Sequence, residues 1–523
     1  MKLQHWFVLM LTAAVQWISP PPSLAQIRPP NILFIFTDDH AAHAISAYGS
    51  TRNVTPHLDR LAAEGILLEN MFCGNAICAP SRATILTGVH THISGQRTNQ
   101  DTFDGSQPTL PKHLQSANYE TAIIGKWHLK STPTGFDHYE VLPGQGAYYN
   151  PDYIHHTEGR RRSTGYSTDL TTDKALDWLT KRNDTERPFL LMLQYKAPHR
   201  PWQPGPRELE LFRDPVPAPP TLDDDHDGRS GVQRFADMSI AHDLEWGYDL
   251  AIDHPNDQQR VTYAQSLARM TDEQRATYEA AFADENAWYL QNEASLTETQ
   301  RLRWRYQRYI SNYLRCVAGV DRNIGRVLDH LEQLNLDDNT LVIYSSDQGF
   351  YLGEHGWFDK RWMYEESLRM PFIARWPGHI PAGTRSSQLT QNIDIAPTLL
   401  DAAGLPIPDR MQGLSILPVL KGQQKTGLRD AVYYHFFASE AWHHVPAHYG
   451  IRTRTHKLMY FYEHDQIELY DLSLDPDENH SVHNDPAYAS TLSQLTTQLN
   501  GLRKHYADNE GEPFNPFKSP DLP

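Results

Sequence analysis

Asn31-Ile32-Leu33-Phe34-Ile35-Phe36-Thr37, followed at once by Asp38-Asp39, is the stretch of sequence that decides the fold. This apolar run lacks the polar alternation of a half-exposed strand, so we expect a strand that is buried on both faces. Three other largely apolar runs also end in a polar cluster. They are Thr121 to Gly125 before Lys126-Trp127-His128, Pro188 to Lys196 before Ala197-Pro198-His199, and Leu341 to Ser346 before Asp347-Gln348.

Helical patterns lie between these runs, with apolar residues three and four positions apart. Examples are Val54 to Gly65, where Gly65 is the expected C-cap, and Tyr313 to Leu334. This alternation of strands and helices predicts an α/β domain with a mainly parallel sheet covered by helices. Ligands bind beyond the carboxyl ends of the strands in such sheets. The four polar clusters are therefore expected to meet at one edge of the sheet.

Two further segments follow different patterns. From about Pro204 to Arg305, proline-rich and acidic stretches precede helices that two capping boxes, Thr271-x-x-Gln274 and Ser295-x-x-Glu298, are expected to open. We interpret 204–305 as an insertion near the polar edge, either a lid or a passive helical addition. Later strands are expected at Tyr433 to Phe437, Tyr449 to Thr453, Lys457 to Tyr462 and Glu468 to Leu472. The sequence thus predicts a main domain at 26–415 and an α+β subdomain with a small antiparallel sheet at 416–523.

The first 25 residues have the form of a secretory signal peptide. Lys2 supplies the positive start, Trp6 to Ile18 the apolar segment and Ser23-Leu24-Ala25 the cleavage site. A membrane anchor is the alternative, but this apolar segment is too short to span a bilayer. No later segment is apolar enough to be a span. We therefore expect an exported protein, periplasmic or secreted.

Composition limits the possible functions. The formal net charge of −17 argues against a broad surface for nucleic acid or for polyanionic chains. An anionic substrate would have to be bound in a local pocket of Lys, Arg, His and metal. Three cysteines are too few for a disulfide framework in a chain of this length. The sequence leaves open whether Cys73 and Cys316 pair.

Asp38-Asp39 and Asp347-Gln348 are candidate metal ligands. Together they offer three carboxylates and an amide carbonyl, which are oxygen ligands that suit calcium or magnesium better than zinc. Two adjacent aspartates would also repel each other without a cation between them. The alternative is that one aspartate caps the next helix and the other faces water. Their shared position after buried strands favours the metal site.

Basic side chains follow two of the same strands. Lys126 and His128 are two residues apart, so they share one face of a strand end and could hold an anion and move protons. Prolines on both sides of the His199 segment fix the backbone and can aim the ring. Lys360 lies in a dense mixture of aromatic and charged residues at 356–362. The alternative for each is an ordinary role in the core or at the surface.

Cys78 opens a further motif, Cys78-Ala79-Pro80-Ser81-Arg82, which continues as ATILTG to Gly88. A free cysteine in this setting is usually buried and inert. With the other motifs, however, the chain resembles type I, formylglycine-dependent sulfatases of the alkaline-phosphatase superfamily. The matching stretches are Asn31 to Asp39, Cys78 to Gly88, Gly125 to His128, Ala197 to His199, Ser346 to Gly349 and Glu468 to Glu478.

The resemblance implies an α/β/α sandwich and conversion of Cys78 to formylglycine by a formylglycine-generating or anaerobic sulfatase-maturating enzyme. One hydroxyl of the hydrated aldehyde would attack sulfur, and the other would later expel sulfate. It implies one calcium ion held by Asp38, Asp39, Asp347, Gln348 and residue 78. Many relatives have Asn or His where this chain has Gln348, but an amide keeps the ligating oxygen.

The resemblance also implies roles for the basic residues. Arg82 and Lys126 would steady the formylglycine, and Lys126 and Lys360 would bind the sulfate. His199 would protonate the departing sugar oxygen, while His128 would take the proton that triggers sulfate release. Arg82 lies four residues after Cys78, one helical turn on if a helix begins there.

Other stretches are similar to bacterial N-acetylglucosamine-6-sulfatase-type enzymes. They are Thr134 to Asn150, Lys196 to Trp202 and Gly353 to Pro371. This similarity implies an exo-acting 6-O-sulfatase on N-acetylglucosamine of a glycosaminoglycan or mucin glycan. Asp359 and Arg361 would bind sugar hydroxyls, and His448 would close the pocket. The alternatives are a sulfatase on an algal polysaccharide, a phosphate mono- or diester hydrolase, and a glycan-binding relative with a dead site. The oligomeric state stays open.

Overall fold

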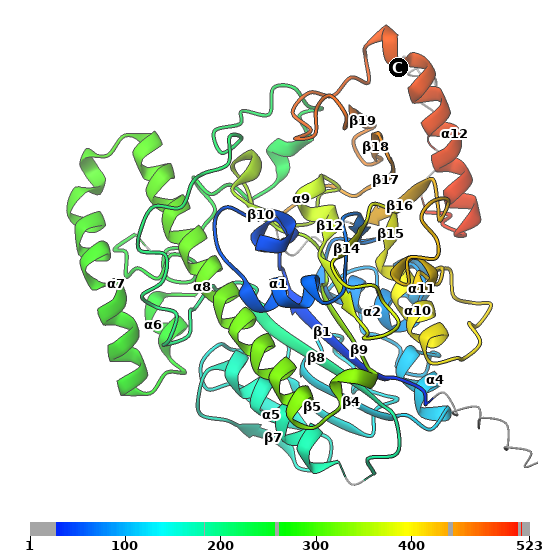
Figure 1. Ribbon diagram of the computed structural model, residues 1–523. Helices are drawn as coiled ribbons and strands as arrows, with labels where there is room; N and C mark the ends of the chain where they lie inside the picture. The colour runs from blue at the N-terminus through cyan, green and yellow to red at the C-terminus, as the bar shows by residue number, and fades with distance from the viewer. Residues whose placement is uncertain (1–27, 183, 257–260, 438–442, 511–513, 515–523) are drawn as a thin grey trace, which may run out of the picture.

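The computed structural model describes residues 28–182, 184–256, 261–437, 443–510 and 514, so the expected signal peptide lies outside it (Figure 1). Within these ranges the largest sheet has ten strands. In spatial order they are β14 (Thr384–Ser386), β2 (Ile66–Leu68), β13 (Phe372–Arg375), β9 (Thr340–Ser346), β1 (Asn31–Asp38), β8 (Phe189–Pro198), β4 (Glu120–Lys126), β5 (His138–Leu142), β6 (Asp152–His155) and β7 (Gly159–Arg162).

The four predicted buried runs form the centre of this sheet as β9, β1, β8 and β4. All neighbours among them pair in parallel, and β5 continues the parallel set. Strands β13, β6 and β7 run antiparallel to their neighbours, which makes the sheet mixed. Every residue of β1, β8 and β9 is buried, as their unbroken apolar runs predict.

Helices cover both faces of the sheet, and the predicted α/β/α sandwich is confirmed. Helices α1 (Pro56–Ala63), α5 (Ser167–Lys181) and α8 (Glu298–Gln333) pack on one face; α2 (Cys78–Thr87), α4 (Leu110–Ser116) and α10 (Ile395–Ala402) pack on the other. Alternate residues of β1 enter the two cores: Ile32 and Phe34 on one side, Leu33 and Ile35 on the other. Cys73 and Cys316 belong to opposite cores and are free thiols, so they do not pair.

Two local predictions need correction. Helix α8 begins after Thr297, whose side chain forms the capping box with Gln300, and not at Ser295. The Ser295 hydroxyl instead donates to the carbonyl of Asn292. Helix α1 ends with Glu64 as its C-cap. Gly65 is needed for a different reason, because a Cβ there would lie 2.0 Å from the Ala374 carbonyl oxygen of β13.

The region around 204–305 contributes α6 (Tyr263–Leu267) and α7 (Asp272–Asn292) before α8. The predicted capping box of Thr271 and Gln274 is present at the start of α7. In Figure 1, α7 lies outside α8, away from the sheet. No helix in the described ranges is both long and apolar enough to cross a membrane.

The C-terminal part forms a separate four-stranded antiparallel sheet, as its alternating short runs predict. Its strands are β16 (Ala431–Phe436), β17 (His448–Thr453), β18 (His456–Phe461) and β19 (Gln466–Asp471), and α12 (Ala489–His505) packs on it (Figure 1). The shorter elements are β3 (Met71–Phe72), α3 (Thr91–Ser94), β10 (Tyr351–Leu352), β11 (Phe358–Asp359), α9 (Glu365–Leu368), β12 (Arg369–Met370), β15 (Thr390–Gln391) and α11 (Leu417–Leu420).

Candidate active site

The polar clusters that follow the central strands meet at the carboxyl edge of the sheet. Asp38 ends β1, Lys126 ends β4, and Asp347 follows β9. Cys78, the first residue of α2, joins them: potential ligand atoms of Asp38, Cys78 and His199 lie within 4.8 Å of one another. Parallel strands therefore bring together side chains that are far apart in the sequence.

Three carboxylates form the centre of this site. Oxygens of Asp38, Asp39 and Asp347 lie within 4.8 Å of one another, and each of these residues is 0% exposed. Asp39 leaves the strand with φ of 67°, and its amide donates to Asp347 Oδ1 at 3.0 Å. This bond ties the end of β1 to the loop after β9.

The donor set fits a hard divalent cation. Asp38 Oδ1 and Gln348 Oε1 are buried and have no hydrogen-bond donor, although the amide nitrogen of Gln348 donates to Asp39. Burial, and then the charge of Asp38, raises the pKa of Asp347, and burial raises the pKa of Asp39 to about 6. A cation among these oxygens would reverse both effects. Carboxylate and amide oxygens are the ligands that calcium prefers.

Three buried cations face the carboxylates. Lys126 Nζ contacts Asp38 and lies 2.5 Å from Gln145 Oε1. Arg82 Nη2 donates to Asp347 Oδ2 at 3.1 Å, and Lys360 Nζ donates to Asp39 Oδ2 at 2.7 Å. Three carboxyl groups thus face three cationic side chains, and their charges balance when all three carboxyls are ionised. The addition of a divalent cation together with an anion would keep the site close to neutral, whereas either one alone would disturb the balance.

The position of Lys126 depends on the glycine before it. Gly125 has φ of 110°, and a Cβ there would lie 1.8 Å from the Gln194 carbonyl oxygen of β8. Only glycine tolerates both the backbone conformation and this close approach. The Gly-Lys pair therefore turns the end of β4 so that Lys126 reaches the carboxylates.

Cys78 is held in place but is not activated as a thiolate. Every residue of α2 is buried, and the Ser81 hydroxyl, one turn into the helix, donates to the Asp347 carbonyl oxygen. Burial, and then the charge of Asp38, raises the pKa of the Cys78 thiol well above its usual value. An unmodified Cys78 would therefore be a poor nucleophile at neutral pH.

Two of the three predicted site histidines, His128 and His199, lie at the same edge. His199 Nδ1 lies 2.5 Å from the Arg200 carbonyl oxygen, so Nδ1 holds a proton, and Nε2 lies 3.8 Å from Asp39 Oδ2. His128 has φ of 55°, and its Nδ1 is buried without a hydrogen-bond partner. Both rings line the same cavity. They are placed to exchange protons with a ligand there.

A cavity of about 250 Å³ opens beside these groups. It is lined by Asn99, Gln100, His128, Gln145, His199, Arg200, Tyr248, Asp359, Lys360, Arg361 and His443. Asp359 and Arg361 flank Lys360 with φ of 76° and 93°, and they pair with each other. The predicted groups Asp359, Lys360 and Arg361 thus share one wall of the cavity.

The structure does not place His448 at this cavity. It is 0% exposed, its Nδ1 bonds the Pro446 carbonyl oxygen, and its ring packs against Trp362 and Phe461. The histidine that lines the cavity is His443, whose Nε2 lies 3.4 Å from Asp359 Oδ2 and 3.3 Å from Arg200 Nη1. Three histidines, His443, His444 and His448, lie in one short segment, so the sequence alone could not choose between them.

Other wall residues were missed because they come from loops. Arg200 directly follows His199 within the matching stretch Lys196 to Trp202, so its place near the site could have been predicted from the sequence. Its guanidinium is held by Asp249 and lies 5.2 Å from the centre of the Tyr248 ring. Tyr248 and Asp249 belong to the 204–305 region, so this region builds part of the cavity wall. Asn99 and Gln100 lie outside the matching stretches, whereas Gln145 lies within Thr134 to Asn150 but was assigned no role.

Comparison with known proteins agrees with this geometry. The Sulfatase family model matches residues 30–405, and the model for the N-sulphoglucosamine sulphohydrolase C-terminal region matches 353–505. The chain is 44% identical over 500 residues to N-acetylglucosamine-6-O-sulfatase of Bacteroides thetaiotaomicron, covering 94% of this chain and 89% of that protein. It is 29% identical over 423 residues to human N-acetylgalactosamine-6-sulfatase, covering 75% and 66% of the two chains.

A solved structure is similar over nearly the same length. The structure of BT4656 in complex with its substrate D-glucosamine-2-N,6-O-disulfate superposes with a TM-score of 0.88 at 44% identity, covering 92% of this chain and 99% of that one. Family match, identity and fold all point to the same family. The chain therefore belongs to the sulfatase family of sulfuric ester hydrolases.

Proposed function

We propose that this chain hydrolyses the 6-O-sulfate ester of a terminal glucosamine-type sugar, such as N-acetylglucosamine 6-sulfate in a glycosaminoglycan or mucin glycan. The observation that carries the proposal is the meeting of Cys78, Asp38 and His199 within 4.8 Å, beside a cavity lined by Lys360. The choice of sugar rests on the 44% identical relative, whose name specifies N-acetylglucosamine-6-O-sulfate hydrolysis.

The proposed cofactors are one calcium ion and formylglycine at position 78. Asp38, Asp39, Asp347, Gln348 and residue 78 would hold the ion, and the two buried oxygens without donors support this assignment. When bound, calcium would supply positive charge for the sulfate, and formylglycine would supply a hydrated aldehyde as the nucleophile. The raised pKa of the unmodified thiol also favours a modified residue over cysteine as the nucleophile.

The lysines and Arg82 would position the reacting groups. Lys126 and Lys360 each contact a carboxylate and are buried, so their ammonium groups can also meet sulfate oxygens without competition from bulk water. Arg82 is fixed by the Lys126 carbonyl oxygen at 2.9 Å and by Gln194 Oε1 at 2.8 Å. It would therefore orient residue 78, one helical turn before it, and not bind the sugar.

The histidines would handle protons at two stages. With Nδ1 of His199 donating to a backbone carbonyl, only the doubly protonated ring can deliver a proton from Nε2 to the departing O6 of the sugar. Burial, and then the charge of Lys126, lowers the pKa of His199, and the negative charge of a bound sulfate ester would oppose this effect. His128 would remove the proton whose loss releases sulfate. His128 lines the cavity that His199 also lines, so both rings can reach one bound ligand.

Sugar recognition is assigned to the cavity wall. Asp359 and Arg361 would bind hydroxyls of the sugar, with His443 in the place first expected for His448. Arg200 and His443 are 3.3 Å apart and both line the cavity. Charged and polar groups held this rigidly discriminate strongly between sugars that differ in one hydroxyl, because a mismatch leaves a buried group unpaired.

Maturation and location follow from the same proposal. A formylglycine-generating or anaerobic sulfatase-maturating enzyme would have to act on Cys78 before α2 folds, since Cys78 is 0% exposed in the folded chain. Residues 1–25 would direct export to the periplasm or the medium. Mass analysis of the peptide that spans residue 78 tests conversion directly.

Initial rates on defined sulfates test the activity. Protein co-expressed with a maturation enzyme is assayed on N-acetylglucosamine 6-sulfate, glucosamine 2-N,6-O-disulfate, N-acetylgalactosamine 6-sulfate, an aryl sulfate and an aryl phosphate. We expect the two glucosamine 6-sulfates to have kcat/KM at least about tenfold above the galactosamine sulfate. Faster turnover of the phosphate would reject the sulfatase assignment, and faster turnover of the galactosamine sulfate would reject only the sugar.

A further inference from the structure

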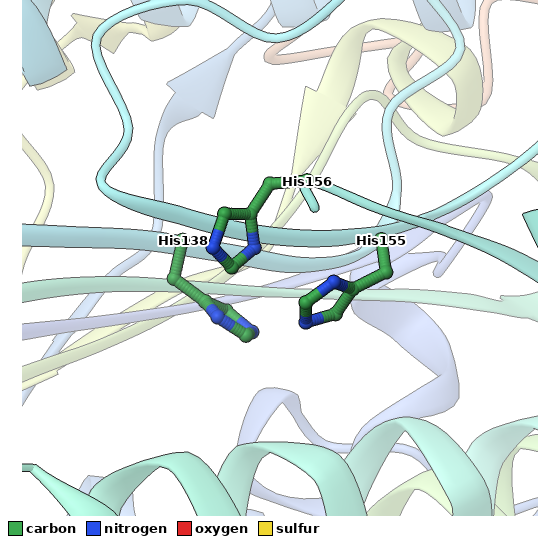
Figure 2. Close-up of side chains that lie close together, drawn as sticks. All are labelled: His138, His155 and His156. Atoms are coloured by element: carbon green, nitrogen blue, oxygen red, sulfur yellow. The ribbon is translucent and has the colours of Figure 1, made fainter. Parts of the chain in front are cut away.

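Three histidines outside the active site lie close together on β5 and at the end of β6, near one edge of the main sheet (Figure 2). His138 begins β5, His155 ends β6, and His156 follows it. One ring nitrogen from each lies within 4.8 Å of the others, and the ring centres are 4.3 to 5.3 Å apart. His138 and His155 are half-buried and His156 is more exposed, and the three rings lie near α5.

Strand pairing explains why the rings converge. β5 and β6 are antiparallel, and His155 pairs directly with Glu140, two residues after His138. Residues two apart on a strand, and residues opposite each other on paired strands, share a face. His138, Glu140 and His155 therefore project together. The chain turns after His155, and the amide of His156 donates to the Tyr139 carbonyl oxygen at 3.0 Å, which keeps the third ring close.

The cluster is separate from the active site. β4 and β5 run parallel, with Ala122 opposite His138 and Lys126 opposite Leu142. Four residues of strand, roughly 13 Å, therefore separate His138 from the level of Lys126. The histidines lie toward the amino ends of these strands, whereas the sulfatase residues lie at the carboxyl ends.

A carboxylate accompanies the imidazoles. Glu140 Oε1 lies 3.6 Å from Nε2 of His138, and this nitrogen is buried without a hydrogen-bond partner. Two ligands on one tetrahedral zinc ion are separated by roughly 3.4 Å. Glu140 Oε1 is thus at a ligand-like separation, while its other oxygen pairs with Lys174.

The hydrogen bonds of His155 also bear on cation binding. Nδ1 of His155 faces the amides of Thr157 and Glu158 at 3.2 Å and the Thr157 hydroxyl at 3.1 Å. Because Nδ1 accepts both amide hydrogen bonds, the neutral ring carries its proton on Nε2. An ion at Nε2 would displace that proton, and a shift of the proton to Nδ1 would break the two amide bonds.

We propose that His138, His155 and His156 form a binding site for a divalent transition-metal ion of the Zn²⁺, Ni²⁺ and Cu²⁺ class, with Glu140 beside it. Imidazole nitrogens select these ions over calcium. A bound ion would join β5 to the β6–β7 hairpin at the edge of the main sheet. The site would act on the structure of this edge and take no part in sulfate ester hydrolysis.

Metal titration of the full chain tests the proposal. Calcium is kept saturating so that the active-site carboxylates are occupied, and ZnCl₂ or NiCl₂ is added in a calorimeter. We expect the wild type to bind one equivalent of Zn²⁺. The double variant His155→Ala/His156→Ala should not bind it. Glu140→Gln keeps all three imidazoles and should weaken zinc binding about tenfold. His505→Ala, an exposed histidine on α12, should bind as the wild type does.

A second measurement covers the case in which the double variant folds poorly. Zinc should raise the unfolding temperature of the wild type and of His505→Ala, and raise it less in Glu140→Gln, in the presence of calcium. Sulfatase activity of Glu140→Gln should equal that of the wild type. Equal zinc stoichiometry and affinity in the wild type, the double variant and Glu140→Gln would overturn the proposal, as would the absence of zinc binding by the wild type under these conditions.

Discussion

At the scale of single residues, the active site is marked by unusual backbone conformations. Asp39, His128, Asp359 and Arg361 have φ of 67°, 55°, 76° and 93°, although none is glycine. The left-handed region costs roughly 1–2 kcal/mol for an ordinary residue. Asp359 and Arg361 are held by their mutual ion pair and by the Tyr434 hydroxyl, which donates to the Arg361 carbonyl oxygen at 2.5 Å. Such concentration of strain is typical of functional sites.

The role proposed for His199 predicts a dependence on the leaving group. His199→Ala should slow hydrolysis of sugar sulfates by about 10²- to 10⁴-fold, because the poor sugar leaving group needs a proton. Aryl sulfates, whose phenolate leaves unaided, should lose much less. The measurement is kcat/KM on one sugar sulfate and one activated aryl sulfate for the wild type and the variant. Equal losses on both substrates would remove this role from His199.

Of the histidines near the start of β17, His443 and His448 predict different effects. His443→Ala should lower kcat/KM on the sugar substrate about tenfold to hundredfold, mainly through KM, because it removes a polar group from the cavity wall. His448→Ala should instead lower stability by about 2–4 kcal/mol, since it leaves a hole in an aromatic core. Steady-state kinetics and urea unfolding on both variants make the comparison. A KM effect confined to His448→Ala would contradict our assignment.

At the scale of elements, α1 is capped by a neighbouring helix. Its own N-cap, Thr55, makes no side-chain capping bond. Asp321 of α8 instead accepts the amides of His57 at 3.1 Å and Leu58 at 2.8 Å. Burial raises the pKa of Asp321 to about 6 despite these bonds. Asp321 thus accepts the N-terminal hydrogen bonds of α1 that the Thr55 side chain does not accept.

This cap predicts a pH-dependent difference between two variants. The folded state binds more protons at Asp321 than the unfolded state between about pH 4 and 6, so this group's contribution to stability falls as pH rises through that range. Asp321→Asn has no carboxyl to ionise, so its free energy of unfolding should not fall in this way. Its advantage over the wild type should grow to about 3 kcal/mol between pH 4 and 7. Asp321→Ala should be less stable than Asp321→Asn at every pH, by about 1–2 kcal/mol, because the amides lose their acceptor.

Urea unfolding at several pH values measures the difference between Asp321→Asn and the wild type. A difference that does not change with pH would show that the carboxyl titrates normally in the folded chain. Equal stability of Asp321→Ala and Asp321→Asn would mean that the capping bonds contribute nothing measurable.

At the scale of the whole molecule, an acidic chain concentrates positive charge where an anion must bind. The formal net charge is −17, yet Arg82, Lys126 and Lys360 are all buried around one site. The carboxylates beside them cancel their charge, so the cavity becomes attractive to sulfate only when a divalent cation is added. This arrangement predicts that stability and activity depend together on calcium.

Calcium removal should therefore lower both the unfolding temperature and the activity. At calcium concentrations 100 times Kd, the bound ion would contribute about 2.7 kcal/mol to stability. Differential scanning calorimetry and activity assays after chelation and calcium add-back measure the effect. Asp347→Asn, which removes one ligand charge, should reduce the response to calcium. Full activity and an unchanged unfolding temperature after complete removal of divalent ions would contradict the proposed cofactor.

The sequence by itself determined the layered fold and the central site. Short, largely apolar runs rich in β-branched residues favour strands buried on both faces, and the residues after them meet at one sheet edge because parallel strands end on the same side. Asp38, Lys126 and Asp347 could be placed together for this reason without any coordinates. The Cys78 motif could be found because it is contiguous.

The tertiary structure alone decided the rest of the cavity wall and the cluster of His138, His155 and His156. Arg200, Tyr248 and His443 come from loops and from the 204–305 region, whose paths depend on long-range packing. His138 and His155 meet through the register of β5 and β6, which no local pattern fixes. The contact between Asp321 of α8 and the start of α1 likewise depends on how two distant helices pack. Local patterns encode which face of an element is buried, whereas contacts between loops and between distant elements are set by the packing of the whole chain.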